Sequence, residues 1–164
     1  MKEIARSADG IPVHFEVVGE GARPLVFVHG WSCDRTYWSE QIEHFARSHE
    51  VVAIDLAGHG ESSGGRRAWT MPAFGGDVVA VIEKLGLADV VLIGHSMGGD
   101  VIVEAALALP GRVAGLVWVD TYSTLGGVRT PAEIEEFVRP FRQDFRSAVE
   151  AFVRRMFVPA SDPS

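Results

Sequence analysis

The chain has one cysteine, few basic residues and no long apolar run. Cys33 therefore cannot form an intrachain disulfide, which is typical of a protein in a reducing compartment. Lys and Arg number 15 against 22 Asp and Glu, so the formal net charge is -7. Because nucleic acids and anionic membranes are bound by clustered basic side chains, this charge disfavours both as partners. The one close basic pair before the C-terminal segment, Arg66-Arg67, lies in a Gly- and Ser-rich loop, and we expect it to be solvated.

Features of export and of membrane insertion are also missing. Residues 1–15 contain no apolar core of a signal sequence, so we expect no secretory signal in this chain. No apolar run approaches the roughly 20 residues that span a bilayer. Hydrophobic residues nevertheless make up 47% of the 164 residues, which predicts a substantial folded core. We expect a soluble, cytoplasmic protein.

Short apolar runs alternate with helix-like segments along most of the chain. An alternating strand is predicted at 13–19, with a hairpin partner in the residues before it. Continuous apolar runs predict buried strands at 24–28, 51–54, 90–94 and 113–119, and the apolar spacing between them predicts helices at 39–49, 71–86 and 98–111. This order predicts an α/β fold with a mostly parallel central sheet flanked by helices.

Polar residues follow four of the predicted strands directly. These are His29, Asp55, Ser96 and Asp120. Because crossover connections are right-handed, the carboxyl ends of parallel strands lie along one edge of the sheet. Ligands of open parallel sheets bind at that edge. The sequence therefore predicts the functional site there.

Ser96 stands in a G-x-S-x-G motif between a predicted strand and a predicted helix, Gly94-His95-Ser96-Met97-Gly98. A sharp strand-to-helix turn holds such a serine in a strained conformation with Oγ exposed. A Cβ at position 94 or 98 would collide across the turn, and the helix N-terminus favours negative charge. The motif predicts a nucleophile at Ser96; the alternative is a Gly-rich turn with an incidental serine.

Three segments together resemble the α/β hydrolase superfamily. They are "VFVHGWSCD" (26–34), "DLAGHGES" (55–62) and "GHSMGG" (94–99), in the family's order and spacing. The resemblance covers roughly residues 10–125. It implies that the strands ending at His29 and Asp120 flank the strand ending at Ser96.

The resemblance also implies the roles of the residues around Ser96. The oxyanion hole would be the backbone N–H groups of Met97 and Trp31, with Gly30 allowing close approach of the backbone. His29 is interpreted as a histidine that braces the loop, and His95 as a site-lining residue that cannot easily take the serine proton. His59 is interpreted as a structural loop residue, and Asp55 and Arg35 as loop residues that hydrogen-bond across the floor of the site. Cys33 is interpreted as a small buried residue; the alternative is a residue that lines the acyl pocket.

A base for the serine is the missing element. The family's order is Ser, then Asp or Glu, then His, and none of the six histidines follows His95. We therefore expect the general-base histidine beyond residue 164. Asp120 is a candidate triad acid; the alternatives are a strand-ending residue at this position and a later carboxylate.

We expect the N-terminal portion of an α/β hydrolase, with core residues 1–124 and the beginning of a helical cap at 125–164. Two amphipathic helices are predicted within 131–157, broken near Pro140. Strand 113–119 would then be a bare apolar edge, which predicts cover by another copy or by a C-terminal piece.

The predicted activity is that of a serine hydrolase on a small ester or related acyl substrate, without a metal or an organic cofactor. One alternative is a non-catalytic binding protein or pseudoenzyme on the same fold. Another is a cofactor-free perhydrolase or lyase.

Overall fold

The computed structural model describes residues 1–62, 64–121 and 130–155. Contacts between residues divide the chain into two compact units, residues 1–122 and 123–164. No helix in the described ranges has both the length and the apolar character needed to cross a membrane.

The first unit is built on one sheet, to which the described residues contribute six strands. They are β1 (Lys2–Arg6), β2 (Pro12–Val18), β3 (Leu25–Val28), β4 (Val51–Ile54), β5 (Val90–His95) and β6 (Val113–Val119), in the order β1-β2-β4-β3-β5-β6. β1, β2 and β4 pair antiparallel, whereas β4, β3, β5 and β6 pair parallel. The expected mostly parallel sheet is confirmed, as is the placement of β3 and β6 on either side of β5.

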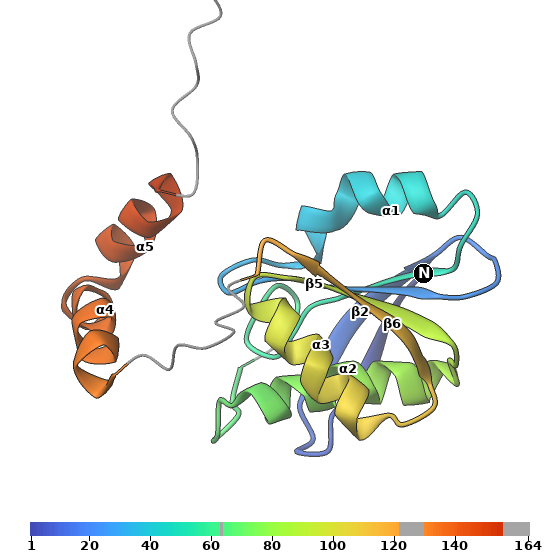
Figure 1. Ribbon diagram of the computed structural model, residues 1–164, viewed down its shortest axis with the longest axis horizontal. Coiled ribbons are helices and arrows are strands. Elements are labelled where there is room, and N and C mark those ends of the chain that lie inside the picture. The colour runs from blue at the N-terminus through green and yellow to red at the C-terminus, as the bar shows by residue number, and fades with distance from the viewer. Residues whose placement is uncertain (63, 122–129, 156–164) are drawn as a thin grey trace, which may run out of the picture. The chain divides into compact units, whose positions relative to one another are not determined.

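Helices cover both faces of this sheet (Figure 1). The 3-10 turn η1 (Arg35–Trp38) leads into α1 (Ser39–Phe45) on one face. On the other face lie α2 (Met71–Leu85) and α3 (Met97–Ala108). α2 begins where Thr70 accepts a hydrogen bond from the backbone of the first turn, and it ends at Gly86 in the left-handed conformation.

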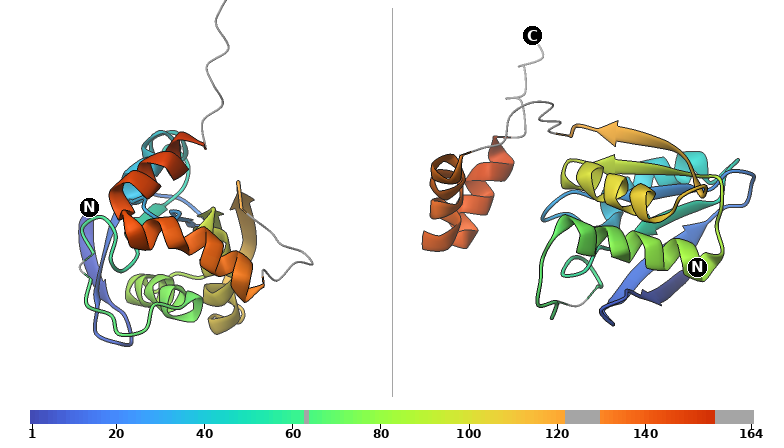
Figure 2. Two further views of the ribbon diagram at one scale, coloured as in Figure 1. Left: turned by 90° about the vertical axis from the view of Figure 1, so that its left-hand side faces the viewer. Right: turned by 60° about the horizontal axis from the view of Figure 1, so that its bottom comes forward.

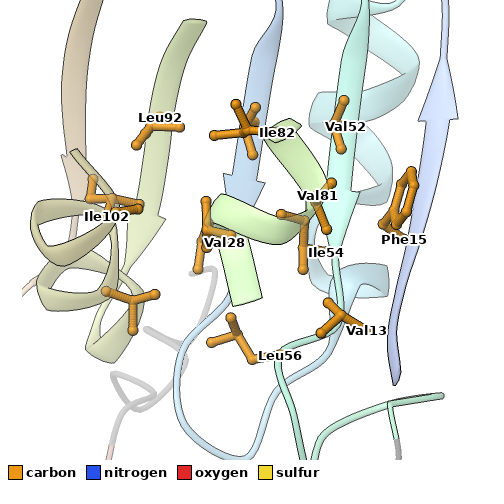
Figure 3. Packing of buried hydrophobic residues seen from close by; sticks show 14 of the residues in the cluster. Val13, Phe15, Val28, Val52, Ile54, Leu56, Val81, Ile82, Leu92 and Ile102 are labelled. Atoms are coloured by element: carbon orange, nitrogen blue, oxygen red, sulfur yellow. The ribbon is translucent and has the colours of Figure 1, made fainter. Parts of the chain in front are cut away.

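The main core lies between the sheet and the pair α2 and α3. Figure 3 shows side chains of β2, β3, β4 and β5 packed with those of both helices, among them Val28, Ile54, Ile82, Leu92 and Ile102. All five are fully buried. A smaller cluster around Phe27 and Trp38 fills the opposite face beneath α1. Because strands β3, β4 and β5 are buried on both faces, their sequences are continuously apolar.

β6 is an edge strand in the described part of the sheet. Three consecutive apolar residues on it, Val117, Trp118 and Val119, are 44, 52 and 38% exposed. An apolar edge of this kind invites pairing with another strand. Its cover by a second copy or by a C-terminal piece stays a prediction.

The second unit contains α4 (Pro131–Gln143) and α5 (Phe145–Arg154), drawn in orange and red in Figure 2. The two predicted helices are confirmed, but Pro140 is not the break, because it lies inside α4 and the helix continues to Gln143. The break comes at Asp144, whose backbone is extended and whose side chain accepts the Ser147 N–H at 3.1 Å. Residues 125–129 and 156–164 of the expected cap lie outside the described residues.

Candidate active site

Ser96 occupies the single residue between β5 and α3. Its backbone has φ 50° and ψ -118°, a conformation that non-glycine residues rarely adopt. Two hydrogen bonds hold it: Ser96 N–H donates to Val119 O at 3.1 Å, and Ser96 O accepts from Gly99 N–H at 2.9 Å. Within residues 1–62, 64–121 and 130–155 no hydrogen bond engages Ser96 Oγ.

Three glycines make this turn sterically feasible. A Cβ on Gly94 would lie 2.3 Å from Gly98 O, and a Cβ on Gly98 would lie 2.5 Å from Val28 O. A Cβ on Gly99 would meet the side chain of Thr121 at 2.2 Å. The first two contacts are with backbone, which cannot move aside cheaply. These positions therefore require glycine, as the motif predicts.

The segment after β3 lies directly against Ser96. A Cβ on Gly30 would be 3.1 Å from Ser96 Cβ, so only glycine lets the backbone come this close without displacing a neighbour. Cys33 N–H donates to Gly30 O at 3.3 Å and closes a tight turn in which Ser32 has φ 58°. Trp31, an exposed residue, is the second residue of that turn. The structure thus brings the Gly30 backbone beside the serine.

Met97 is the first residue of α3. The first N–H groups of a helix have no carbonyl partner within the helix and carry partial positive charge. This end of α3 lies next to Ser96, so negative charge that develops near the hydroxyl is favoured electrostatically. The oxyanion roles of Met97 and Trp31 stay predictions.

His29 is fully buried and joins the ends of two strands. Its Nε2 accepts from Leu56 N–H at 3.0 Å, so the proton is on Nδ1, which donates to Gly30 O at 2.8 Å. Burial lowers the pKa of His29 to about 4, and the positive charge of His59 acts in the same direction. His29 is therefore neutral at pH 7, and both of its nitrogens are engaged. This arrangement is that of a bracing residue.

His95 closes β5, and its ring meets the buried Trp38 edge-on, with ring centroids 6.3 Å apart. A Cβ on Gly30 would lie 3.0 Å from His95 Nδ1. In the described parts of the chain no hydrogen bond joins His95 to Ser96. Trp38 itself was missed by the sequence reasoning, because only the tertiary structure brings η1 to the end of β5. Its Nε1 has no hydrogen-bond partner among the described residues.

A buried ion pair lies below the loops of the site. Asp55 is 1% exposed; its Oδ1 accepts Arg35 N–H at 2.8 Å and its Oδ2 accepts Glu61 N–H at 2.9 Å. The Arg35 guanidinium contacts the same carboxylate and also Glu61 Oε2 at 2.9 Å. Burial acts to lower the pKa of Arg35, but the carboxylates of Asp55 and Glu61 overcome it and raise the pKa. The expected hydrogen bonding of these two loop residues is present, and the structure adds that they form an ion pair with each other.

Arg66 corrects an expectation. Its side chain is buried instead of solvated, and it pairs with Asp77 Oδ1 at 2.5 Å and with Asp9 Oδ2 at 2.7 Å. A hydrogen bond from Arg66, with help from Ser7, lowers the pKa of Asp9 to about 2. An aspartate in the apolar stretch of α2 was the one signal that could have indicated a buried cation. Arg67 is exposed, as expected.

Two candidate residues remain, Asp120 and Cys33. Asp120 directly follows β6, is exposed and has φ 46°. No hydrogen bond or ion pair of its carboxylate occurs in the described structure. Val119, the residue before Asp120, accepts the Ser96 N–H with its carbonyl oxygen, so the backbone next to Asp120 is adjacent to the serine. Cys33 was expected to be buried but is half-buried, and its Sγ lies 3.5 Å from Trp31 O.

No three His, Cys, Asp or Glu side chains within the described ranges are grouped so as to hold a metal ion. Two surface cavities lie away from Ser96. One, of about 330 Å³, lies between α2 and α3 beside Arg6, and the other, of about 430 Å³, lies beside Arg66 and Arg67. Neither includes a residue of the G-x-S-x-G motif.

Residues 23–161 match a family model described as the alpha/beta hydrolase fold. The chain is 35% identical over 111 residues to the dihydrolipoyllysine-residue acetyltransferase component of the acetoin cleaving system of Cupriavidus necator, which covers 68% of this chain and 30% of that protein. It is 34% identical over 145 residues to a non-heme haloperoxidase of Rhodococcus erythropolis, with coverage of 87% and 52%.

Among solved structures, a thermophilic esterase from Thermogutta terrifontis is 31% identical with a TM-score of 0.79. That match covers 95% of this chain and 57% of the esterase. The chain thus spans between 30 and 57% of the length of these three relatives.

Proposed function

The chain belongs to the α/β hydrolase family, and from that premise we propose that it is the N-terminal portion of a serine hydrolase that cleaves small esters or related acyl compounds. The observation that carries the proposal is the backbone of Ser96. A residue at φ 50° between a buried strand and a helix, with backbone collisions that require glycine at positions 94 and 98, holds its hydroxyl at the apex. Strain of this kind persists only where the surrounding structure enforces it.

In the proposed reaction, Ser96 Oγ attacks the substrate carbonyl and loses its proton to a histidine. The carbonyl oxygen becomes an oxyanion held by the N–H groups of Met97 and Trp31. Collapse of this intermediate expels the alcohol and leaves an acyl-serine, which water then hydrolyses by the same route. Removal of one oxyanion donor typically lowers kcat by about 10² to 10³-fold.

The two histidines at the strand ends beside Ser96, His29 and His95, do not suit the role of base. His29 is buried and neutral with both nitrogens engaged, and His95 is packed against Trp38. We propose that the base is a histidine beyond residue 164, oriented by Asp120 or by a later carboxylate. The lengths of the relatives, of which this chain spans at most 57%, support this placement. A reading frame with no histidine after residue 164 would contradict it.

A fluorophosphonate probe tests the nucleophile. The probe should label Ser96 in the protein isolated from its own reading frame, as located by peptide mass spectrometry, and Ser96→Ala should abolish labelling. Ser48→Ala, at an exposed serine, is the matched control and should label like the wild type. Equal labelling of Ser96→Ala would refute the proposal by showing that another residue is the nucleophile. Absence of labelling in the wild type would refute it and favour a non-catalytic binding protein.

The non-heme haloperoxidase among the relatives favours a second candidate, perhydrolysis at the same serine. Hydrogen peroxide would then replace water in attacking the acyl-serine, giving a peracid and free Ser96. Peracid formation from acetate esters in the presence of peroxide, measured against simple hydrolysis, separates the two activities. Loss of both in Ser96→Ala is expected in either case.

A further inference from the structure

The segment from His29 to Arg35 is held at both ends by residues that follow β4. At the first end His29 accepts the Leu56 N–H at 3.0 Å, and at the second Asp55 accepts the Arg35 N–H at 2.8 Å. Trp31 lies between these two anchors, inside the turn that Cys33 closes onto Gly30. Beside the pairing of β3 with β5, the path of the segment that contains Trp31 is therefore also held from the end of β4.

Asp55 carries most of this arrangement. Its carboxylate accepts two backbone N–H groups, those of Arg35 and Glu61, and it also pairs with the Arg35 guanidinium. A buried charge is tolerated only where hydrogen bonds satisfy it, and loss of one partner is disruptive. The Asp55–Arg35 pair thus links the backbone of the 29–35 segment rigidly to the end of β4.

Gly60 shows how closely the neighbouring loop is shaped around the Asp55 carboxylate. It has φ 50°, and a Cβ at this position would lie 2.4 Å from Asp55 Oδ2. Gly58, in the same loop, has φ 77°, but a Cβ there would meet the ring of Trp69 instead, at 2.8 Å. Two glycines with similar backbone demands therefore differ in whether a side chain would displace Asp55.

We propose that Asp55 and Arg35 are positioning residues for the oxyanion donor at Trp31. They act on the reaction only through the 29–35 segment, so the inference rests on the proposed function. Displacement of a reacting or stabilising group by about 1 Å can lower a rate by about 10²-fold. A disturbed Asp55–Arg35 pair should therefore slow chemistry at Ser96 while leaving substrate binding nearly unchanged.

The test uses saturation kinetics of Ser96 labelling by a fluorophosphonate in the full-length protein. Asp55→Asn keeps an oxygen for the Arg35 N–H but removes the charge that holds the guanidinium. We expect the maximal labelling rate to fall by about 10- to 100-fold, with the half-saturating concentration within about threefold of the wild-type value.

Asp77→Asn is the matched control. Asp77 is fully buried, pairs with a buried arginine, Arg66, and accepts the Ala57 N–H at 3.1 Å, but it makes no hydrogen bond to the 29–35 segment. Its replacement should destabilise the fold in a similar way. The labelling rate of the folded Asp77→Asn variant should stay within about twofold of the wild type, because only the stability of the fold is affected.

A second pair of variants tests the positioning role of Asp55 even if Asp55→Asn does not fold. Gly60→Ala should slow labelling because its Cβ pushes the Asp55 carboxylate, whereas Gly58→Ala carries a similar backbone strain without that displacement. Equal rates in Gly60→Ala and Gly58→Ala, or in Asp55→Asn and Asp77→Asn, would overturn the inference and leave the proposed function intact. Absence of wild-type labelling would overturn both.

Discussion

The buried imidazole of His29 makes the stability of this protein depend on pH. In the folded state burial lowers the pKa from 6.5 to about 4, so the folded protein takes up this proton only at low pH. The unfolded chain takes it up near the ordinary value of 6.5. Between these values protonation favours the unfolded state, and stability falls as the pH is lowered.

The size of the effect follows from the two pKa values. One pKa unit corresponds to about 1.4 kcal/mol, so the full difference amounts to about 3 kcal/mol. About 2 kcal/mol of this is lost between pH 7 and pH 5, since the unfolded state is almost fully protonated at pH 5. This is a large fraction of the 5–15 kcal/mol typical of a small domain.

Urea unfolding of the wild type and of His29→Gln at pH 7 and pH 5 measures this contribution. The amide of glutamine can replace both hydrogen bonds of His29 but does not titrate. The advantage of the wild type over the variant should shrink by about 2 kcal/mol at the lower pH. Because both proteins share all other titrating groups, their common pH dependence cancels in the difference.

His44→Gln serves as the control, since His44 is exposed on α1. Its free energy of unfolding should follow that of the wild type at both pH values. If the difference between the wild type and His29→Gln were the same at pH 7 and pH 5, the buried neutral histidine inferred here would be wrong.

Three further predictions concern the turn at Ser96, the ion pair between Asp9 and Arg66, and the edge strand β6. Gly98→Ala should lower the free energy of unfolding, measured in urea, by about 2–3 kcal/mol. Gly76→Ala, with open space around its Cβ, should raise it by about 0.5–1 kcal/mol, and similar effects of the two variants would contradict the steric argument. Because the pKa of Asp9 is lowered to about 2 by Arg66, stability should fall from pH 4 to pH 2 by more in the wild type than in Asp9→Asn, and parallel acid curves would disprove this contribution. Trp118→Lys should reduce self-association through β6 in sedimentation experiments at high protein concentration, and an unchanged oligomeric state would exclude that edge as the contact.

Local patterns in the sequence were enough to predict the central strands and the turn at Ser96. Buried parallel strands are apolar along their whole length because both faces are covered, so β3, β4 and β5 could be located within a residue or two. The turn at Ser96 could be located for a steric reason. A Cβ at Gly94 or Gly98 would collide with atoms only a few residues away or on the adjacent strand.

Local patterns failed where long-range pairing decided the outcome. Arg66 sits in a Gly- and Ser-rich loop, yet it is buried because Asp9, 57 residues away, and Asp77 meet it in space. Pro140 was expected to break the helix, but the hydrogen-bonding side chain of Asp144 sets the boundary instead.

The sequence by itself determined the strained turn at Ser96, because its glycines and its position between strand and helix are properties of neighbouring residues. It also determined the family, through three motifs in a set order. Only the tertiary structure decided that His29 is neutral, that Asp55 holds Arg35, and that Gly30 lies against the serine. These depend on burial and on distances between strands β3, β4 and β5, which arise only when the sheet has formed.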